Sequence, residues 1–262
     1  MRIRALCGVA MFIAAAAANA GVIVENVMRD LTGGRPERQL STSVQGGMMR
    51  IQVKDGGGMI FKNDVFYSID PNTKTYMAMD RASIKQMSDQ LAPMMKQMQE
   101  QLASMPPEQR AQMEKMMAGT GMNMGKAKTR SVRKTTRAGQ VAGNACSYFE
   151  VLEDGVVDTE LCVVPAAKLS GGPEFMEASI KMGGVLKDMF SSLGPLQALV
   201  DKNVALYSEI GGIPVLTRTF ADGKPALETT LKTMRSQAVP AATFEIPQGY
   251  TKREMPTMPA RQ

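Results

Sequence analysis

Two cysteines on either side of a turn constrain the fold of this chain more than any other feature of its sequence. Cys146 and Cys162 flank two runs of β-favouring residues, and Asp154-Gly155 lies between the runs. This pattern predicts a β-hairpin. A two-residue loop at Asp154-Gly155 would turn the cysteines to opposite faces, whereas a three-residue loop, Glu153-Asp154-Gly155, places Cys146 directly opposite Cys162. We therefore predict the three-residue loop and a Cys146–Cys162 disulfide.

The predicted register divides the side chains of the hairpin between two faces. The apolar face consists of Phe149, Val151, Val157, Leu161 and Val163. The cysteine face also carries Tyr148, Glu150, Asp158 and Glu160. A catalytic dithiol is the alternative interpretation of the two cysteines, but the sequence has neither a C-x-x-C motif nor a base to activate a thiol.

The first twenty residues are typical of a secretory signal peptide. Arg2 and Arg4 precede an apolar run that ends in Ala18-Asn19-Ala20, a small-x-small cleavage site. A membrane anchor is disfavoured, because the run over 6–18 is shorter than the roughly 20 residues that span a bilayer. We expect cleavage after Ala20 and export to the periplasm, an oxidising compartment in which disulfides form.

The composition bounds the function of the remaining chain. Histidine is absent from the whole sequence, which excludes histidine-based catalytic triads and His-ligated metal sites. No paired carboxylates or phosphate-binding loop stand out either. We expect one domain over 21–254, a flexible tail over 255–262, no enzymatic activity and no cofactor.

The domain is expected to alternate extended and helical segments. Short β-prone runs separated by turn signals predict an antiparallel meander over 21–29, 39–45, 48–54, 59–62, 65–69 and 75–79. Apolar residues then recur every three or four positions, which predicts a helical hairpin inserted at about 81–118. After it we expect strands at 129–137, 205–210, 214–220 and 226–236 and helices at 173–192 and 196–202.

Four segments of the chain resemble a known family. They are Tyr67–Met77, Ala142–Tyr148, Gly212–Val215 and Phe244–Tyr250, and they are similar to the recurring segments of domain of unknown function family 4412, a relative of the LolA-like lipoprotein carriers. The resemblance covers roughly 21–252 and implies an α+β fold in which a curved antiparallel half-barrel is covered by helices on its concave face. The methionine-rich hairpin is an insertion that the carriers do not share.

Methionine is unusually abundant, with 24 residues in the chain and twelve of them between Met77 and Met124. Core packing explains this without any function. A deformable apolar surface for a lipid or a partner helix is a second explanation, because methionine is unbranched and polarizable. Capture of Cu(I) by thioether groups is a third; the candidate ligands are Met94, Met95, Met98, Met113, Met116 and Met117.

These features predict a non-enzymatic binding protein for a hydrophobic ligand, a lipid or the acyl chain of a lipoprotein. The ligand would occupy a gap between sheet and helices. Its expected lining is Phe149, Val151, Leu161, Val163, Met87, Leu91, Met94 and Met98. The alternatives are a methionine-based Cu(I)-binding protein and a protein-interaction module that uses the helical hairpin.

A cluster of cationic side chains follows the predicted helical hairpin. It contains Lys126, Lys128, Arg130, Arg133, Lys134 and Arg137 without an intervening acid. Such a cluster can contact an anionic membrane surface, or it can be a solvated strand. Nucleic acid is not expected as a partner, because no aromatic residues interleave with the cations to stack on bases.

Overall fold

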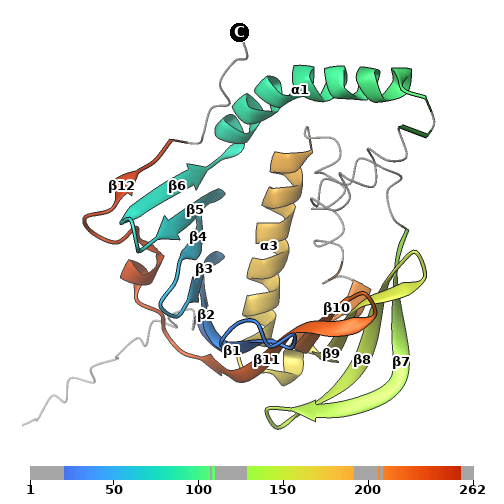
Figure 1. Cartoon of the computed structure of the whole chain (residues 1–262). Helices are drawn as coiled ribbons and strands as arrows, with labels where there is room; N and C mark the ends of the chain where they lie inside the picture. Colours follow the sequence, from blue (N-terminus) through green and yellow to red (C-terminus); the bar gives the residue numbers. More distant parts are fainter. Residues whose placement is uncertain (1–20, 107, 110–128, 192–205, 207–208, 255–262) are drawn as a thin grey trace, which may run out of the picture.

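One large β-sheet dominates the fold. The computed structural model describes residues 21–106, 108–109, 129–191, 206 and 209–254, so the predicted signal peptide and the predicted tail lie outside it. Twelve strands follow the order β12-β6-β5-β4-β3-β2-β1-β11-β10-β9-β8-β7. The sheet is strongly curved, and helix α3 lies on its inner side (Figure 1). The protein is therefore α+β with a curved sheet, as predicted.

The first half of the sheet is the expected antiparallel meander. Its strands are β1 (Val22–Asp30), β2 (Arg38–Gln45), β3 (Met48–Val53), β4 (Gly58–Lys62), β5 (Val65–Asp70) and β6 (Thr75–Met79). Tight turns join them. Between β4 and β5 both turn residues have positive φ, 52° at Asn63 and 59° at Asp64, a backbone conformation that these two residue types tolerate better than most.

The second half of the sheet joins the first through β1, which pairs with both β2 and β11. Its strands are β7 (Arg130–Val141), β8 (Asn144–Glu153), β9 (Val156–Val164), β10 (Ile213–Ala221) and β11 (Lys224–Ser236). Pro214 lies inside β10, and the register with β9 shifts between Pro214 and Leu216. Proline lacks a backbone N–H, so a bulge is one of the few places where a strand accepts it.

One strand departs from the predicted antiparallel arrangement. β12 (Thr251–Lys252) pairs in parallel with β6 at Thr75 and Tyr76, so the sheet is mixed. The strand has only two residues, too few for any alternation of apolar and polar side chains, and a sequence pattern does not predict it.

The described helices agree in part with the prediction. α1 (Arg81–Ser104) is the expected first arm of the insertion, and α3 (Gly172–Phe190) is the expected helix over 173–192. Of the second arm of the insertion only Glu108 and Gln109 are described, and both are helical; the short helix over 196–202 lies outside the described residues. Two short 3-10 helices, η1 (Ala166–Lys168) and η2 (Ala241–Phe244), complete the elements.

The predicted strand over 205–210 is wrong. Leu206, Glu209 and Ile210 are helical. Leu206 and Ile210 both pack on the same apolar cluster of the β8–β9 hairpin. Side chains four residues apart share a face in a helix and in a strand alike, so this apolar spacing does not distinguish the two.

Both faces of the first half of the sheet are covered. Neighbouring residues of β4 show this, because Phe61 belongs to the cluster that includes α3 residues, whereas Ile60 belongs to a cluster with Phe244 of η2. We call these the inner and outer clusters. Figure 1 shows η2 on the outer side of the sheet. Buried members of the inner cluster include Val22, Val44, Phe61, Phe66, Ala178 and Val185.

The start of α1 carries a reciprocal cap that leads to a first prediction. The Ser83 N–H donates to Asp80 Oδ1 at 2.7 Å, and the Asp80 N–H donates to Ser83 Oγ at 2.9 Å. We expect Asp80→Ala to lower the free energy of unfolding by about 1 kcal/mol. Chemical denaturation measures this, and a Ser104→Ala control at the other end of α1 should change it by less than about 0.5 kcal/mol.

The same cap predicts a dependence on pH. Hydrogen bonds from the backbone and side chain of Ser83 lower the pKa of Asp80. A carboxyl whose pKa is lower in the folded state stabilises that state above its unfolded pKa of about 3.9, and the contribution is lost as the pH falls through the folded value. The difference between wild type and Asp80→Asn should therefore be full at neutral pH and shrink below pH about 4. A difference that stays constant down to pH about 2 would contradict the assignment.

Candidate functional site

The predicted disulfide is confirmed. Cys146 and Cys162 are bonded, with an S–S distance of 2.02 Å and Cα atoms 5.4 Å apart. Both cysteines are buried and belong to the inner cluster. The bond ties β8 to β9 on the face of the hairpin that contacts the main core.

The predicted three-residue loop is wrong. Glu153 pairs with Val156, so the turn consists of Asp154 and Gly155 alone, both with positive φ. The register then shifts in β9, where Asp158 is left without a direct partner between two paired positions. The bulge adds one residue to β9 and so returns Cys162 to the face of Cys146, which a two-residue loop without a bulge would not allow. Cys162 consequently lies opposite Tyr148 and diagonal to Cys146, on the same face.

The two predicted faces of the hairpin exist, with one exception. Phe149 is paired with Leu161, and both lie on the face opposite the disulfide. Val157 was expected on that face too, but it pairs with Leu152 on the far side of the bulge, so its placement was wrong. The reason is the same extra residue, Asp158, which reverses the alternation between the turn and the rest of the strand.

The apolar face of the hairpin has its own cover. Val151, Leu161 and Val163 form a buried cluster with Ile210, and Leu206 packs against it. Met87 of α1 packs against the inner cluster instead. The expected ligand-lining residues that are described thus fall into two separate clusters. The side chains of Leu91, Met94 and Met98 lie outside the described part of α1.

The space between the sheet and the helices is rich in methionine. Eight methionines belong to the inner cluster or pack against it: Met49, Met59, Met79, Met87, Met176, Met182, Met189 and Met234. They come from both halves of the sheet and from both α1 and α3. None of the eight except Met87 was among the expected ligand-lining residues, because a strand contributes only one or two methionines and no sequence repeat marks them.

Helix α3 carries a local weakness where it covers this methionine-rich interior. Gly183 and Gly184 lie in the middle of the helix, and each interior glycine costs roughly 0.5–1 kcal/mol of helix stability relative to alanine. Gly183 is buried. A Cβ atom added at Gly184 would meet nothing within 4 Å, so close packing does not require glycine at that position.

The candidate copper ligands cannot be placed. Met113, Met116 and Met117 lie outside the described residues, and so do the side chains of Met94, Met95 and Met98. In the part of the chain that is described, no group of three or more His, Cys, Asp or Glu side chains is arranged to hold a metal ion. The Cu(I) hypothesis stays a prediction from the sequence.

The described members of the predicted basic cluster have acidic or aromatic neighbours within the protein. Arg130 pairs with Glu209 at 3.8 Å, Arg133 with Glu150 and Arg137 with Glu160. Lys134 lies over the ring of Phe149, 5.9 Å from its centroid. Lys126 and Lys128 are outside the described residues. The three arginines are thus compensated internally, which reduces the charge that they present to a membrane.

These pairs are part of a row of charges that crosses the sheet. Arg218 contacts Glu160 at 3.3 Å and Glu228 at 2.6 Å, and its hydrogen bonds to Glu228 raise its pKa. We call these residues the charged row; from β7 to β1 it consists of Arg133, Glu150, Glu160, Arg218, Glu228 and Arg29. Each residue of the row is paired with the next one on the neighbouring strand. Glu160 is 8% exposed, so the row is partly buried.

A bulge in β7 adds one more cation to the row. The register of β7 with β8 shifts between Lys134 and Ala138, and Arg137 lies within the shifted stretch. Its guanidinium carbon is 3.6 Å from the centroid of the Tyr148 ring. The bulge therefore lets Arg137 stack on Tyr148 and reach the buried carboxylate of Glu160.

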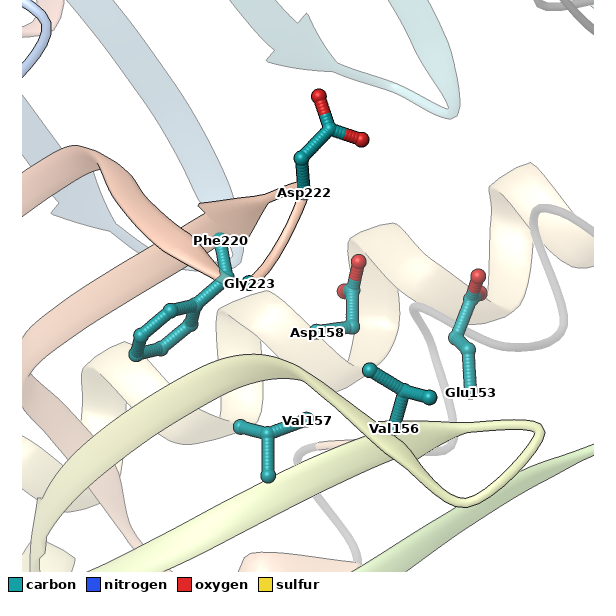
Figure 2. Close-up of a pocket in the computed structure, with 7 residues that line it drawn as sticks. All are labelled: Glu153, Val156, Val157, Asp158, Phe220, Asp222 and Gly223. Atoms are coloured by element: carbon teal, nitrogen blue, oxygen red, sulfur yellow. The ribbon is translucent and has the colours of Figure 1, made fainter.

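A cleft of about 220 Å³ lies at the ends of two hairpins. Figure 2 shows its lining, which consists of Glu153, Val156, Val157, Asp158, Phe220, Asp222 and Gly223. A second, smaller hollow of about 30 Å³ lies near Arg50 and Tyr250. Neither is lined by the methionines of α1 or α3, so neither is the expected acyl-chain site.

Comparisons with known proteins give only distant likenesses. No protein-family model matches the chain, and no curated protein is significantly similar. Among solved structures, an uncharacterized conserved protein from Thermus thermophilus superimposes with a TM-score of 0.46 at 6% identity, over 90% of this chain and 91% of that one.

MucB structures are also similar in part. The crystal structure of MucB gives a TM-score of 0.36 at 11% identity, over 86% of this chain and 56% of MucB. The MucA/MucB complex of Pseudomonas aeruginosa gives 0.36 at 10% identity, over 86% and 54%. This chain thus spans just over half the length of the MucB chains.

None of the helices in the described ranges is both long enough and apolar enough to cross a membrane.

Proposed function

We propose that the chain is a non-enzymatic, exported binding protein of the LolA-like half-barrel kind, and that its ligand is the acyl chain of a lipid or lipoprotein. The observation that supports this most directly is the methionine-rich interior, where eight methionines lie between the sheet and helices α1 and α3. An unbranched thioether side chain adapts to varied apolar shapes at low cost. Such an interior can close on itself and reopen around a ligand.

The opening would involve α3. Gly183 and Gly184 make the middle of this helix easier to bend than its ends. At its C-terminal end α3 is tied to α1 by an ion pair between Arg81 and Asp188 at 3.0 Å, and both side chains are more than half exposed. An exposed ion pair contributes at most about 1 kcal/mol. The cover over the interior is therefore held mainly by apolar packing, which an acyl chain can replace.

The energetics of such binding are favourable. Burial of each methylene group of an acyl chain contributes about 0.8 kcal/mol, so ten buried methylenes contribute roughly 8 kcal/mol before costs. Several kcal/mol of this gain are lost, because α3 must be displaced from part of the inner cluster and the acyl chain must be ordered. Micromolar affinity, about −8 kcal/mol, requires a chain of more than ten carbons.

Titration of the mature protein with a fluorescent C16 fatty acid tests the proposal. We expect saturable binding of one chain per protein with a Kd in the micromolar range. Gly184→Ala should weaken binding about threefold, because it stabilises straight α3 by roughly 0.5–1 kcal/mol without a steric clash. Lys181→Ala, at an exposed position of the same helix, is the matched control. It should change the Kd by less than twofold, which corresponds to a change in binding free energy of about 0.4 kcal/mol. Absence of saturable binding would contradict the proposal.

A further inference from the structure

A buried polar side chain lies on the inner face of the sheet. Thr42 of β2 is 7% exposed. It is paired with Val24 of β1 on one side and with Ile51 of β3 on the other. Val24 belongs to the inner cluster, and Ile51 packs against it. Residues that lie directly opposite each other on antiparallel strands share a face of the sheet, so the Thr42 side chain also points to the inner face.

The row of paired residues that contains Thr42 is otherwise apolar. From β4 to β11 it consists of Met59, Ile51, Thr42, Val24 and Met234. The two methionines at its ends are among the eight that form or contact the inner cluster. Helix α3 packs on both β1 and β2, the strands at the middle of the row. Thr42 therefore places a hydroxyl within the methionine-rich interior, under the cover that α3 provides.

The hydroxyl of Thr42 has no hydrogen-bond partner among the residues that the structure describes. Most buried side-chain polar atoms in proteins have such a partner, and an unpaired one destabilises the fold. The adjacent residue shows the usual arrangement, because Ser41 Oγ donates to Glu25 Oε1 at 3.0 Å. The hydroxyl of Thr42 is thus a buried donor that a ligand entering the interior can use.

We propose that Thr42 donates a hydrogen bond to the carbonyl oxygen of a bound acyl ester or acyl amide. This inference rests on the acyl-chain function proposed above and names the group that the interior recognises. An ester or amide carbonyl is neutral, and its burial costs little once it accepts a hydrogen bond. The carboxylate of a free fatty acid is charged and is far more costly to bury. The ligand is therefore an acylated molecule, in which the carbonyl lies beside Thr42.

The stability of Thr42→Val tests whether the hydroxyl is unpaired in the ligand-free protein. Valine keeps the branched shape and replaces the hydroxyl with a methyl group, so we expect the Tm to rise by about 2–4 °C. Thr233→Val is the matched control, the same change at an exposed position of β11, and should move the Tm by less than about 2 °C. A lower Tm for Thr42→Val would show that the protein itself satisfies the hydroxyl, which would overturn the proposal.

Titration of the mature protein with three C16 probes tests recognition of the carbonyl. The probes are methyl palmitate, N-methylpalmitamide and palmitate, each delivered from cyclodextrin. Thr42→Val should weaken binding of the ester or the amide about fivefold, the effect of one lost hydrogen bond. The Kd of palmitate should change by less than twofold in the same variant. The tighter of the first two probes identifies the source of the carbonyl, an ester-linked lipid or an N-acylated polypeptide.

Infrared spectroscopy of the bound ester provides a readout that does not depend on affinity. The carbonyl is labelled with ¹³C to separate its stretching band from those of the protein. A hydrogen bond weakens the C=O bond, so the band should lie at a lower wavenumber in the wild type than in Thr42→Val. Thr233→Val should give the wild-type band.

The outcomes separate this inference from the function on which it rests. Equal affinities of wild type and Thr42→Val for the ester and the amide, or an unchanged carbonyl band, would overturn the role of Thr42 and leave acyl-chain binding intact. Absence of saturable binding for all three probes would contradict the acyl-chain function itself, and the inference would fail with it.

Discussion

Replacing both Cys146 and Cys162 with alanine is expected to lower the free energy of unfolding by about 3 kcal/mol. The bond closes a loop between residues separated by sixteen positions, and its loss frees that loop in the unfolded chain. Both cysteines are buried, so alanine also leaves small voids that add to the loss. Urea denaturation of the oxidised wild type and the double variant, followed by circular dichroism, measures the difference.

Reduction of the wild type provides the control for this prediction. Unfolding under strong reducing conditions should give nearly the same free energy as the double alanine variant, since the loop is open in both. Labelling of the folded, exported wild type by a thiol reagent without prior reduction would contradict the disulfide. So would a double variant as stable as the wild type.

Phe61→Ala is expected to cost about 4 kcal/mol of stability. Phe61 is 1% exposed and lies in the inner cluster, with its ring centroid 4.8 Å from that of Phe66. The cavity left behind would open into the methionine-rich interior. If that interior accepts an acyl chain, a C16 fatty acid at about 100 times its Kd should restore about 2.7 kcal/mol.

The neighbouring residue provides a matched control. Ile60 is also 1% exposed but belongs to the outer cluster with Phe244. Ile60→Ala should cost roughly 2–5 kcal/mol, and the cavity it leaves lies on the other face of the same strand. Fatty acid should therefore stabilise Ile60→Ala no more than it stabilises the wild type. A greater stabilisation of Ile60→Ala than of Phe61→Ala would place the acyl site on the wrong side of the sheet.

Local patterns predicted the strands well because turn-forming residues mark the ends of each short strand. Asn63-Asp64 ends β4 and starts β5 with two residues that tolerate positive φ. The first arm of the insertion was equally clear, since α1 begins where the apolar spacing changes from two to three or four. Both signals lie within a few residues of the element that they define.

Register was harder to predict because a bulge has no local signature here. Asp158 looks like any polar strand residue, yet it shifts every pairing from Thr159 through Cys162 relative to the pairings next to the turn. The cysteines fixed which face each side chain near them occupies, because their bond requires a common face. They did not fix the loop, since a three-residue loop and a two-residue loop with a bulge both satisfy that requirement.

The charged row and the cleft could not be predicted from the sequence for a related reason. Glu160, Arg218 and Glu228 are far apart in the chain and meet only because β9, β10 and β11 are neighbours in this register. The cleft residues Asp158 and Asp222 come together where two strands separate. Contacts of this kind depend on strand order, which composition and periodicity leave open.

Photolabelling with a diazirine-bearing C16 fatty acid tests the central claim most directly. Irradiation of the mature protein at a probe concentration near the Kd, followed by peptide mapping, reports which side chains contact the acyl chain. We predict adducts on α3 near Met182 and Met189 and on β3 or β6 near Met49 and Met79, and these adducts should disappear when unlabelled fatty acid competes. Adducts confined to the outer cluster around Phe244, or adducts that competition does not reduce, would contradict an acyl-chain site in the methionine-rich interior.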